Sequence, residues 1–198
     1  MQMKMKLTVL AAMAAAFGAV SAQEVVKIGH VGPTSGAIAH LGKDNENGDP
    51  KQGTAAAQKL VDAKVNGVIG HLNSGTTIPA SKIYSDAGIP QISPSSTNPK
   101  YTRQGYRTAF RVVADDVHLG GTLGRYAVNQ LKGKSVAVID DRTAYGQGVA
   151  NEFEKAVKAA GATIVGREFT SDKATDFMAI LTTLKGKKVD VVFFGGMD

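Results

Sequence analysis

From residue 117 onward, the chain alternates three helical patterns with three short apolar strand patterns, and this alternation narrows its possible folds most. The helical patterns cover 117–131, 146–160 and 175–184, and the strand patterns cover 135–139, 162–165 and 189–194. Short links that contain glycine join them. Such alternation is typical of a parallel sheet with right-handed crossover connections. The sequence therefore predicts an α/β fold.

The first half of the chain continues this organisation. Strand patterns occupy 25–31, 67–70, 89–92 and 108–113, and helical patterns occupy 51–64 and 78–87. Gly88 stands where a left-handed residue ends a helix. Residues 93–105, rich in Ser, Pro and Asn, predict a long loop. Ligands of open α/β sheets bind beyond the carboxyl ends of the strands, which makes 32–36, 71–77, 93–97, 140–148 and 195–198 the candidate loops.

The first 22 residues are expected to be a cleavable signal peptide. Lys4 and Lys6 precede an apolar run over 7–20, and Val20-Ser21-Ala22 offers the small residues that a signal peptidase reads. The alternative is a membrane anchor, but a run of about 14 residues is shorter than the roughly 20 that a spanning helix needs. We therefore expect a periplasmic protein whose mature chain starts at Gln23.

Composition excludes several functions. The chain has no cysteine, so it has no disulfides, no thiolate metal sites and no lipid anchor after the signal peptide. We therefore expect a freely soluble product. Its four histidines show no metal-binding spacing, and neither a metal nor a cofactor is expected: His30, His40, His71, His118. The net charge of +6 is spread thinly, and without a basic stripe with interleaved aromatics no nucleic-acid partner is expected.

No enzyme motif is complete in this sequence. The glycines of 29–36 lack the dinucleotide-binding spacing, and Gly133-Lys134-Ser135 lacks the earlier glycine of a phosphate-binding loop and precedes a strand. Neither a nucleophile elbow nor a zinc-protease motif is present. Asp140-Asp141 is either a catalytic carboxylate pair or, the favoured interpretation, a helix cap that pairs with a neighbour such as Arg142. We expect no enzyme.

Two strand ends carry polar loops suited to a small charged ligand. Residues 71–77 place hydroxyls and backbone N–H groups directly before a helix, where free amides and the helix dipole favour an anion. Residues 93–99 repeat this arrangement at the next strand end. Each loop alone is more typical of a helix cap or a turn than of a ligand site. Together, on adjacent strand ends, they indicate a small zwitterionic ligand.

Three segments resemble the leucine/isoleucine/valine-binding proteins of bacterial ABC importers. Residues 70–81 and 92–99 resemble the two ligand loops of their first lobe, and 140–148 resembles a strand-end motif of their second lobe. The resemblance implies a type I periplasmic-binding-protein fold, in which two α/β lobes with parallel sheets close on a ligand by hinge bending. It also implies a monomer that binds an amino acid, branched-chain in the first instance, and delivers it to a membrane permease. A sensory or regulatory domain of the same fold, for amides or similar ligands, is the alternative.

The resemblance also assigns four ligand contacts. Ser74 and Thr97 would hold the α-carboxylate of the ligand through hydroxyl and backbone N–H groups. The carbonyl of Ser95 would accept from the α-ammonium group. Tyr145 would close over the ligand from the second lobe.

The same comparison divides the chain into a signal peptide at 1–22, a first lobe at 23–113 and a second lobe at 114–198. In the family, a helix and a strand precede the Asp-Pro pair, but here Gly48 abuts Asp49. We expect that helix and strand to be absent, with exposed apolar surface and a gap in the sheet as consequences. The second lobe stops after its strand at 189–194. Both lobes are therefore expected to be incomplete. The resemblance places an acidic residue that contacts the ligand ammonium group in the part of the second lobe beyond this strand, so the chain as written is expected to bind amino acids poorly or not at all.

Overall fold

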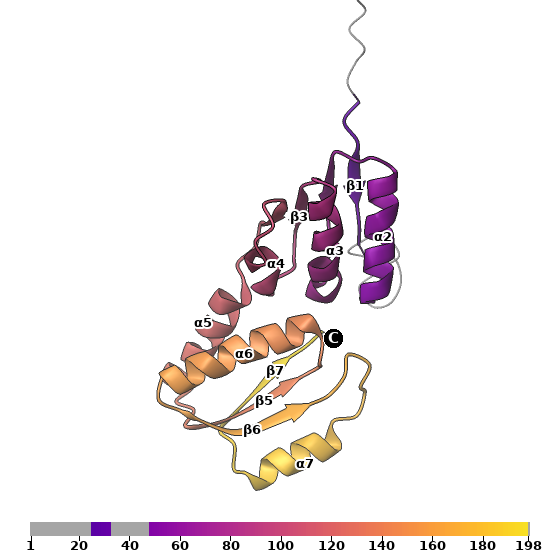
Figure 1. Cartoon of the computed structure of the whole chain (residues 1–198). Coiled ribbons are helices and arrows are strands. Elements are labelled where there is room, and N and C mark those ends of the chain that lie inside the picture. Colours follow the sequence, from indigo (N-terminus) through magenta and orange to yellow (C-terminus); the bar gives the residue numbers. More distant parts are fainter. Residues whose placement is uncertain (1–24, 33–47, 198) are drawn as a thin grey trace, which may run out of the picture.

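The computed structural model describes residues 25–32 and 48–197, and the strands within these ranges form two parallel sheets (Figure 1). The first sheet has the order β1-β2-β3-β4, and the second has the order β6-β5-β7. All neighbours in both sheets run parallel. The strands are β1 (Ile28–His30), β2 (Gly67–Ile69), β3 (Gln91–Ser93), β4 (Ala109–Arg111), β5 (Ser135–Asp140), β6 (Thr163–Phe169) and β7 (Val191–Gly195).

Helices connect successive strands, as the alternation in the sequence predicts. Among the described residues they are α2 (Pro50–Asp62), α3 (Ser74–Asp86), α4 (Lys100–Arg103), α5 (Asp116–Asn129), α6 (Ala144–Ala159) and α7 (Met178–Gly186). Pro50 opens α2, where its missing N–H costs nothing, and the side chain of Asp49 accepts from the Lys51 amide at 2.8 Å. Gly88 has a φ of 69°, which confirms the predicted left-handed residue after α3.

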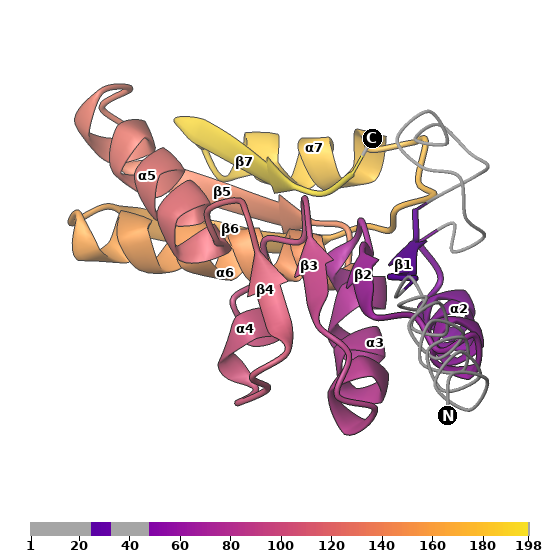
Figure 2. The same cartoon turned by 90° about the horizontal axis from the view of Figure 1, so that it is seen from above.

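Among the described elements, helices cover only one face of the first sheet. Helices α2 and α3 lie side by side against that face (Figure 2) and share a core with the strands: Val31, Ala57, Val68, Ala80, Tyr84, Ile89. On the opposite face, Ile69, Ile92 and Phe110 stand in register on three neighbouring strands. Their side chains are 46%, 41% and 49% exposed, respectively. The expected exposed apolar surface is therefore present.

The expected gap in the first sheet is wrong for the described strands. β1 pairs directly with β2, with Ile28 opposite Gly67 and His30 opposite Ile69. The reason is that α2 itself is the crossover helix that two consecutive parallel strands need.

The second sheet is covered on both faces. Val136 and Val138 pack toward α6, against Phe153 and Val157, while Ala137 and Ile139 form a separate cluster with Leu184 of α7. This division follows from the alternation of side chains along β5. Figure 1 shows α6 and α7 on opposite sides of the strands.

The close packing of α5 on α6 depends on glycine. A Cβ built on Gly124 would lie 2.7 Å from the Cβ of Ala156, and one built on Gly120 would lie 2.8 Å from the Phe153 nitrogen. Neither distance leaves room for a side chain. These two glycines set how closely α5, the helix that follows the first sheet, approaches the second sheet.

Several element boundaries in the first half differ from prediction. Helix α3 begins at Ser74, four residues before the predicted start, because the Asn73 carbonyl already accepts from the Thr76 and Thr77 amides at 3.1 and 2.9 Å. The predicted loop at 93–105 contains the short helix α4.

Two further sequence predictions, the boundary between the lobes and the signal peptide, stay predictions. The boundary predicted between the lobes at 113/114 falls between β4 and α5, and the signal peptide lies outside the described residues. None of the helices within 25–32 and 48–197 has the length and hydropathy to cross a bilayer.

Candidate functional site

The first candidate loop leads into the N-terminus of α3. Asn73 caps this helix without a side-chain hydrogen bond, and its carbonyl takes the amides of Thr76 and Thr77. No described residue accepts from the amides of Ser74 and Gly75, which belong to the first turn, where helical partners are lacking. Ser74 is only 1% exposed. The site therefore offers two N–H groups and a hydroxyl at the positive end of a helix.

The second candidate loop, between β3 and α4, is joined to the first by side-chain hydrogen bonds. The Ser93 hydroxyl donates to the His71 carbonyl at 2.8 Å, and the Ser95 hydroxyl donates to the Leu72 carbonyl at 2.7 Å. The Ser96 hydroxyl donates to the Ser74 oxygen at 3.2 Å. These bonds bring the predicted residues Ser74 and Ser95 to the same edge of the first sheet.

Thr97 lies where this loop meets the start of α5. Its carbonyl accepts from the Asp116 amide at 2.9 Å. Its hydroxyl oxygen is buried and has no hydrogen-bond partner among the described residues. The amide of the next residue, Asn98, donates to the Ser74 hydroxyl at 3.2 Å. The hydroxyls of Ser74 and Thr97 are thus parts of one small polar cluster.

Asp116, which the sequence did not single out, lies beside Thr97, because its amide donates to the Thr97 carbonyl. It is fully buried, and neither of its carboxylate oxygens has a hydrogen-bond partner among the described residues. Burial raises its pKa to about 6, while the nearby Thr97 hydroxyl and Arg111 act in the opposite direction. The Thr97 hydroxyl is close enough to influence the carboxyl, but its geometry falls short of a hydrogen bond. An unpaired buried carboxylate is costly unless a cation reaches it.

A signal for Asp116 was present in the sequence. Asp115 and Asp116 stand together at a helix start, but the cap uses only Asp115, which accepts from the Val117 and His118 amides at 3.1 and 3.4 Å. The second acid therefore had no structural task in the cap.

Tyr145 approaches the same cluster from the second sheet. It stands in the first turn of α6 and is half-buried. Burial raises the pKa of its hydroxyl, and the negative charges of Asp116 and Asp141 add to this shift. Tyr145 therefore lies within electrostatic reach of Asp116, and its contact with a ligand stays a prediction.

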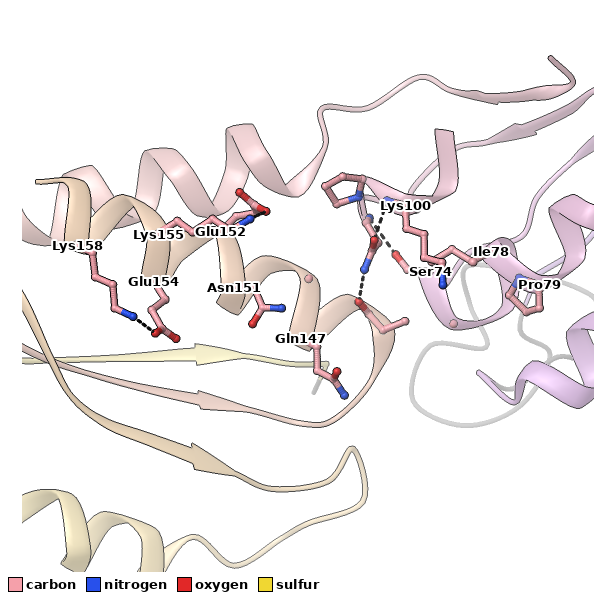
Figure 3. A pocket seen from close by; sticks show the side chains of 15 residues that line it. Ser74, Ile78, Pro79, Lys100, Gln147, Asn151, Glu152, Glu154, Lys155 and Lys158 are labelled. Carbon is pink, nitrogen blue, oxygen red and sulfur yellow. Dashed lines mark hydrogen bonds and ion pairs between the residues drawn. The ribbon is translucent and has the colours of Figure 1, made fainter. Parts of the chain in front are cut away.

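A groove of about 620 Å³ runs outward from this cluster between α3 and α6. Figure 3 shows Ser74 and Ile78 on one side of it and Gln147 and Asn151 on the other. Ser74 lines the groove, whereas Ser95, Thr97 and Tyr145 do not. Ser74 therefore stands between the groove and the polar cluster around Asp116.

The acid pair in the second half has a structural role. Asp140 forms an ion pair with Arg167 and accepts from the Arg142 amide at 2.9 Å. Asp141 accepts from the Thr143 amide at 2.9 Å and from the Met197 amide at 2.9 Å. The favoured interpretation, a helix cap that pairs with a neighbour such as Arg142, was wrong in both details: neither acid caps α6, and the Arg142 guanidinium lies 3.7 Å from the centre of the Phe169 ring. The cap of α6 is Thr143.

Within the described ranges, His, Asp and Glu side chains form no group of three or more that could hold a metal ion. The polar cluster instead combines hydrogen-bond donors for an anion with a carboxylate for a cation. Donors for an anion beside a carboxylate for a cation are the groups that a small zwitterionic solute would require.

Comparison with known proteins gives the family. The family model of the periplasmic binding proteins matches residues 43–197, and the chain belongs to this family. A Leu/Ile/Val-binding protein homologue of Brucella abortus is 44% identical over 149 residues, which cover 75% of this chain and 40% of the relative. A leucine-, isoleucine-, valine-, threonine- and alanine-binding protein of Pseudomonas aeruginosa is 39% identical over 75% of this chain and 40% of its own length.

Solved structures agree on the fold. The substrate-binding protein of a branched-chain amino acid transporter from Streptococcus pneumoniae, solved with isoleucine, superimposes with a TM-score of 0.75. It is 26% identical, over 86% of this chain and 57% of that chain. The predicted type I periplasmic-binding-protein fold is confirmed, and this chain comprises only part of it. These relatives are named as binding proteins, which confirms that the family function is not enzymatic.

Proposed function

We propose that these residues form the amino-acid site of the substrate-binding component of an ABC importer, and that its ligand is a branched-chain amino acid. The Asp116 carboxylate is the observation that carries this proposal. It is buried without a hydrogen-bond partner among the described residues, next to the donors of Ser74 and Thr97. A ligand with both an ammonium and a carboxylate group matches this pair of charges.

In the proposed complex, the Ser74 and Thr97 hydroxyls and the backbone amides beside them hold the α-carboxylate. The ammonium group lies between Asp116 and the carbonyl of Ser95, which accepts from no described residue. Tyr145 covers the ligand from the second lobe. The hydroxyl of Ser74 already accepts two hydrogen bonds, from Ser96 and Asn98, so its own hydrogen remains for the ligand.

The choice of ligand and partner rests on the relatives. The proteins of Brucella and Pseudomonas are named for branched-chain amino acids, and the Streptococcus structure holds isoleucine. By analogy we propose a membrane permease as the partner, lobes at 23–113 and 114–198, and export through the signal peptide at 1–22. Sequencing of the exported protein from its N-terminus tests the cleavage before Gln23.

An NMR titration of the isotope-labelled chain tests the site, because it detects binding even in the millimolar range. L-leucine is compared with 4-methylpentanoate, which lacks the ammonium group, and with 3-methylbutylamine, which lacks the carboxylate. We expect leucine to shift the amide signals of Ser74, Gly75 and Thr97 at a lower concentration than either analogue. Equal responses to leucine and 4-methylpentanoate would contradict the role of Asp116.

Variants complete this test. Ser74→Ala and Asp116→Asn should each weaken leucine binding about tenfold or more, since each removes a hydrogen bond to a charged group. Asp172→Asn is the matched control, because Asp172 is exposed and lies in the link before α7. If Ser74→Ala and Thr97→Ala both leave the affinity unchanged, the site assignment is wrong.

A further inference from the structure

Arg111, the last residue of β4, binds the second candidate loop and the helix that follows it, α4, with one side chain. Its Nη1 donates to the carbonyls of Ser96 and Asn98 at 3.0 and 3.1 Å. Its Nη2 donates to the hydroxyl of Thr102, in α4, at 2.6 Å. No other described side chain binds two carbonyls of this loop.

These bonds fix the direction of the peptide unit that matters for an anion. The peptide between Ser96 and Thr97 is trans, so its carbonyl and its N–H point in opposite directions. Because the Ser96 carbonyl points to Arg111, the Thr97 N–H points away from it. No described residue accepts from that N–H. Arg111 thereby leaves the Thr97 amide available to a ligand.

The neighbouring peptide unit is fixed in the same way from another element. The Thr97 carbonyl accepts from the Asp116 amide at 2.9 Å, which turns the Asn98 N–H toward the Ser74 hydroxyl, 3.2 Å away. Arg111 therefore holds the carbonyls of Ser96 and Asn98, and the start of α5 holds the carbonyl of Thr97 between them. Loss of either anchor would let the loop rotate and would disorder both donors.

The surroundings of Arg111 favour arginine over lysine. The guanidinium lies 5.6 Å from the ring centre of Tyr101, which is fully buried and donates to the Phe110 carbonyl at 2.9 Å. A planar guanidinium has five N–H donors in a fixed arrangement, so it can reach two carbonyls and a hydroxyl at once. An ammonium group offers no such fixed spread of donors.

We propose that Arg111 is a positioning residue for the binding site: it holds the loop of residues 96–98 so that the Thr97 amide faces the ligand. It does not touch the ligand itself. The effect on affinity rests on the proposed function, whereas the effect on the loop does not.

Amide hydrogen exchange of the ligand-free chain tests the effect on the loop. In Arg111→Met, the Asn98 amide should exchange about tenfold faster or more, since it loses the geometry of its bond to Ser74, while the Val138 amide in β5 keeps its rate. Arg111→Lys should fall between the two. Arg107→Met is the control, because Arg107 is an exposed arginine just before β4. If Asn98 and Val138 accelerate equally, the residue acts only on global stability and the proposal fails.

A leucine titration tests the effect on binding. Arg111→Met should weaken leucine binding by about tenfold or more, and Arg107→Met should leave it unchanged. If Asn98 loses protection but leucine affinity does not fall, Arg111 orders the loop without positioning a ligand donor, and the proposal is overturned. If the unmodified chain binds neither leucine nor another amino acid, the proposed function fails, and the exchange measurement still decides the effect on the loop.

Discussion

The side-chain amide of Asn98 donates to the main-chain carbonyl of Ala144 at 2.6 Å. This bond joins the loop after β3 of the first sheet to the first residue of α6 on the second sheet. It is a direct polar contact between the two halves, next to the residues of the candidate site. The relative position of the two sheets and the geometry of the site are therefore coupled.

Replacing Asn98 should loosen this coupling. Asn98→Ala removes the bond to Ala144 and also the bond that the Asn98 side-chain oxygen accepts from the Lys100 amide at 2.9 Å, so it should lower the free energy of unfolding by about 1 to 3 kcal/mol. Small-angle scattering should show a larger radius of gyration if the halves separate. Asn129→Ala, at the C-terminal end of α5, serves as the control. An unchanged radius together with unchanged stability would show that the bond does not hold the halves together.

Gly148 should tolerate no side chain. A Cβ at this position in α6 would lie 2.6 Å from the Asn98 Nδ2 atom and would clash with the Asp116 carboxylate. Glycine to alanine in a helix normally stabilises by up to about 1 kcal/mol, so a loss of stability in Gly148→Ala would be due to this contact. Gly186→Ala, in α7, is the control, because a Cβ there meets no atom within 4 Å. Urea denaturation of both variants measures the difference, and equal effects would contradict the clash.

Asp116 should make stability depend on pH. Its carboxyl has a pKa of about 6 in the folded chain, against an ordinary value of 3.8. Between these values the unfolded chain binds fewer protons, so stability falls as pH rises from about 4 to 6 and stays lower above that window. The loss is at most about 3 kcal/mol for a shift of two units.

Asp116→Asn removes this titration. The variant should match the unmodified chain near pH 4 and should be more stable at pH 7, although it binds leucine less well. Urea denaturation at several pH values gives the difference between the two chains, from which the other titrating groups largely cancel. A difference that does not change with pH would refute the raised pKa.

Tyr84 should contribute through its hydroxyl as well as through its ring. The hydroxyl lies 3.0 Å from the Nε2 atom of His71, and both side chains are buried. Tyr84→Phe should cost about 1 to 3 kcal/mol, because it leaves a buried polar atom of His71 without this partner. Tyr126→Phe, on an exposed tyrosine of α5, should cost far less. Thermal unfolding compares the two variants, and equal losses would rule out a specific role for the His71 contact.

Periodicity was enough to locate most elements. The strands at 67–69, 135–140 and 191–195 are short and apolar, so local pattern and tertiary fold agree there. The prediction of a gap in the first sheet was wrong, because strand pairing there depends on residues far apart in the sequence. The gap expected in the first sheet is absent because β1 and β2 pair directly across 36 intervening residues, 31–66.

Some residues of the candidate site could be predicted from the sequence, and others could not. Ser74, Ser95, Thr97 and Tyr145 could be named from the sequence because they stand in recognisable loops, and the structure places the first three at one sheet edge and Tyr145 near Asp116. Their ligand contacts stay predictions. Asp116 and Arg111 carry no local signal of comparable strength, since one follows a capping aspartate and the other ends an ordinary strand.

The sequence by itself determined the α/β class, the order of the elements and the polar loops at the strand ends, because these depend on the spacing of apolar and turn-forming residues along a short stretch. Only the tertiary structure decided that Asp116 is buried without a hydrogen-bond partner among the described residues and that Arg111 binds the loop carbonyls. Burial and hydrogen-bond partners depend on which residues lie close together in the folded chain. They arise from elements that approach each other after folding, here the loop after β3, the end of β4 and the start of α5.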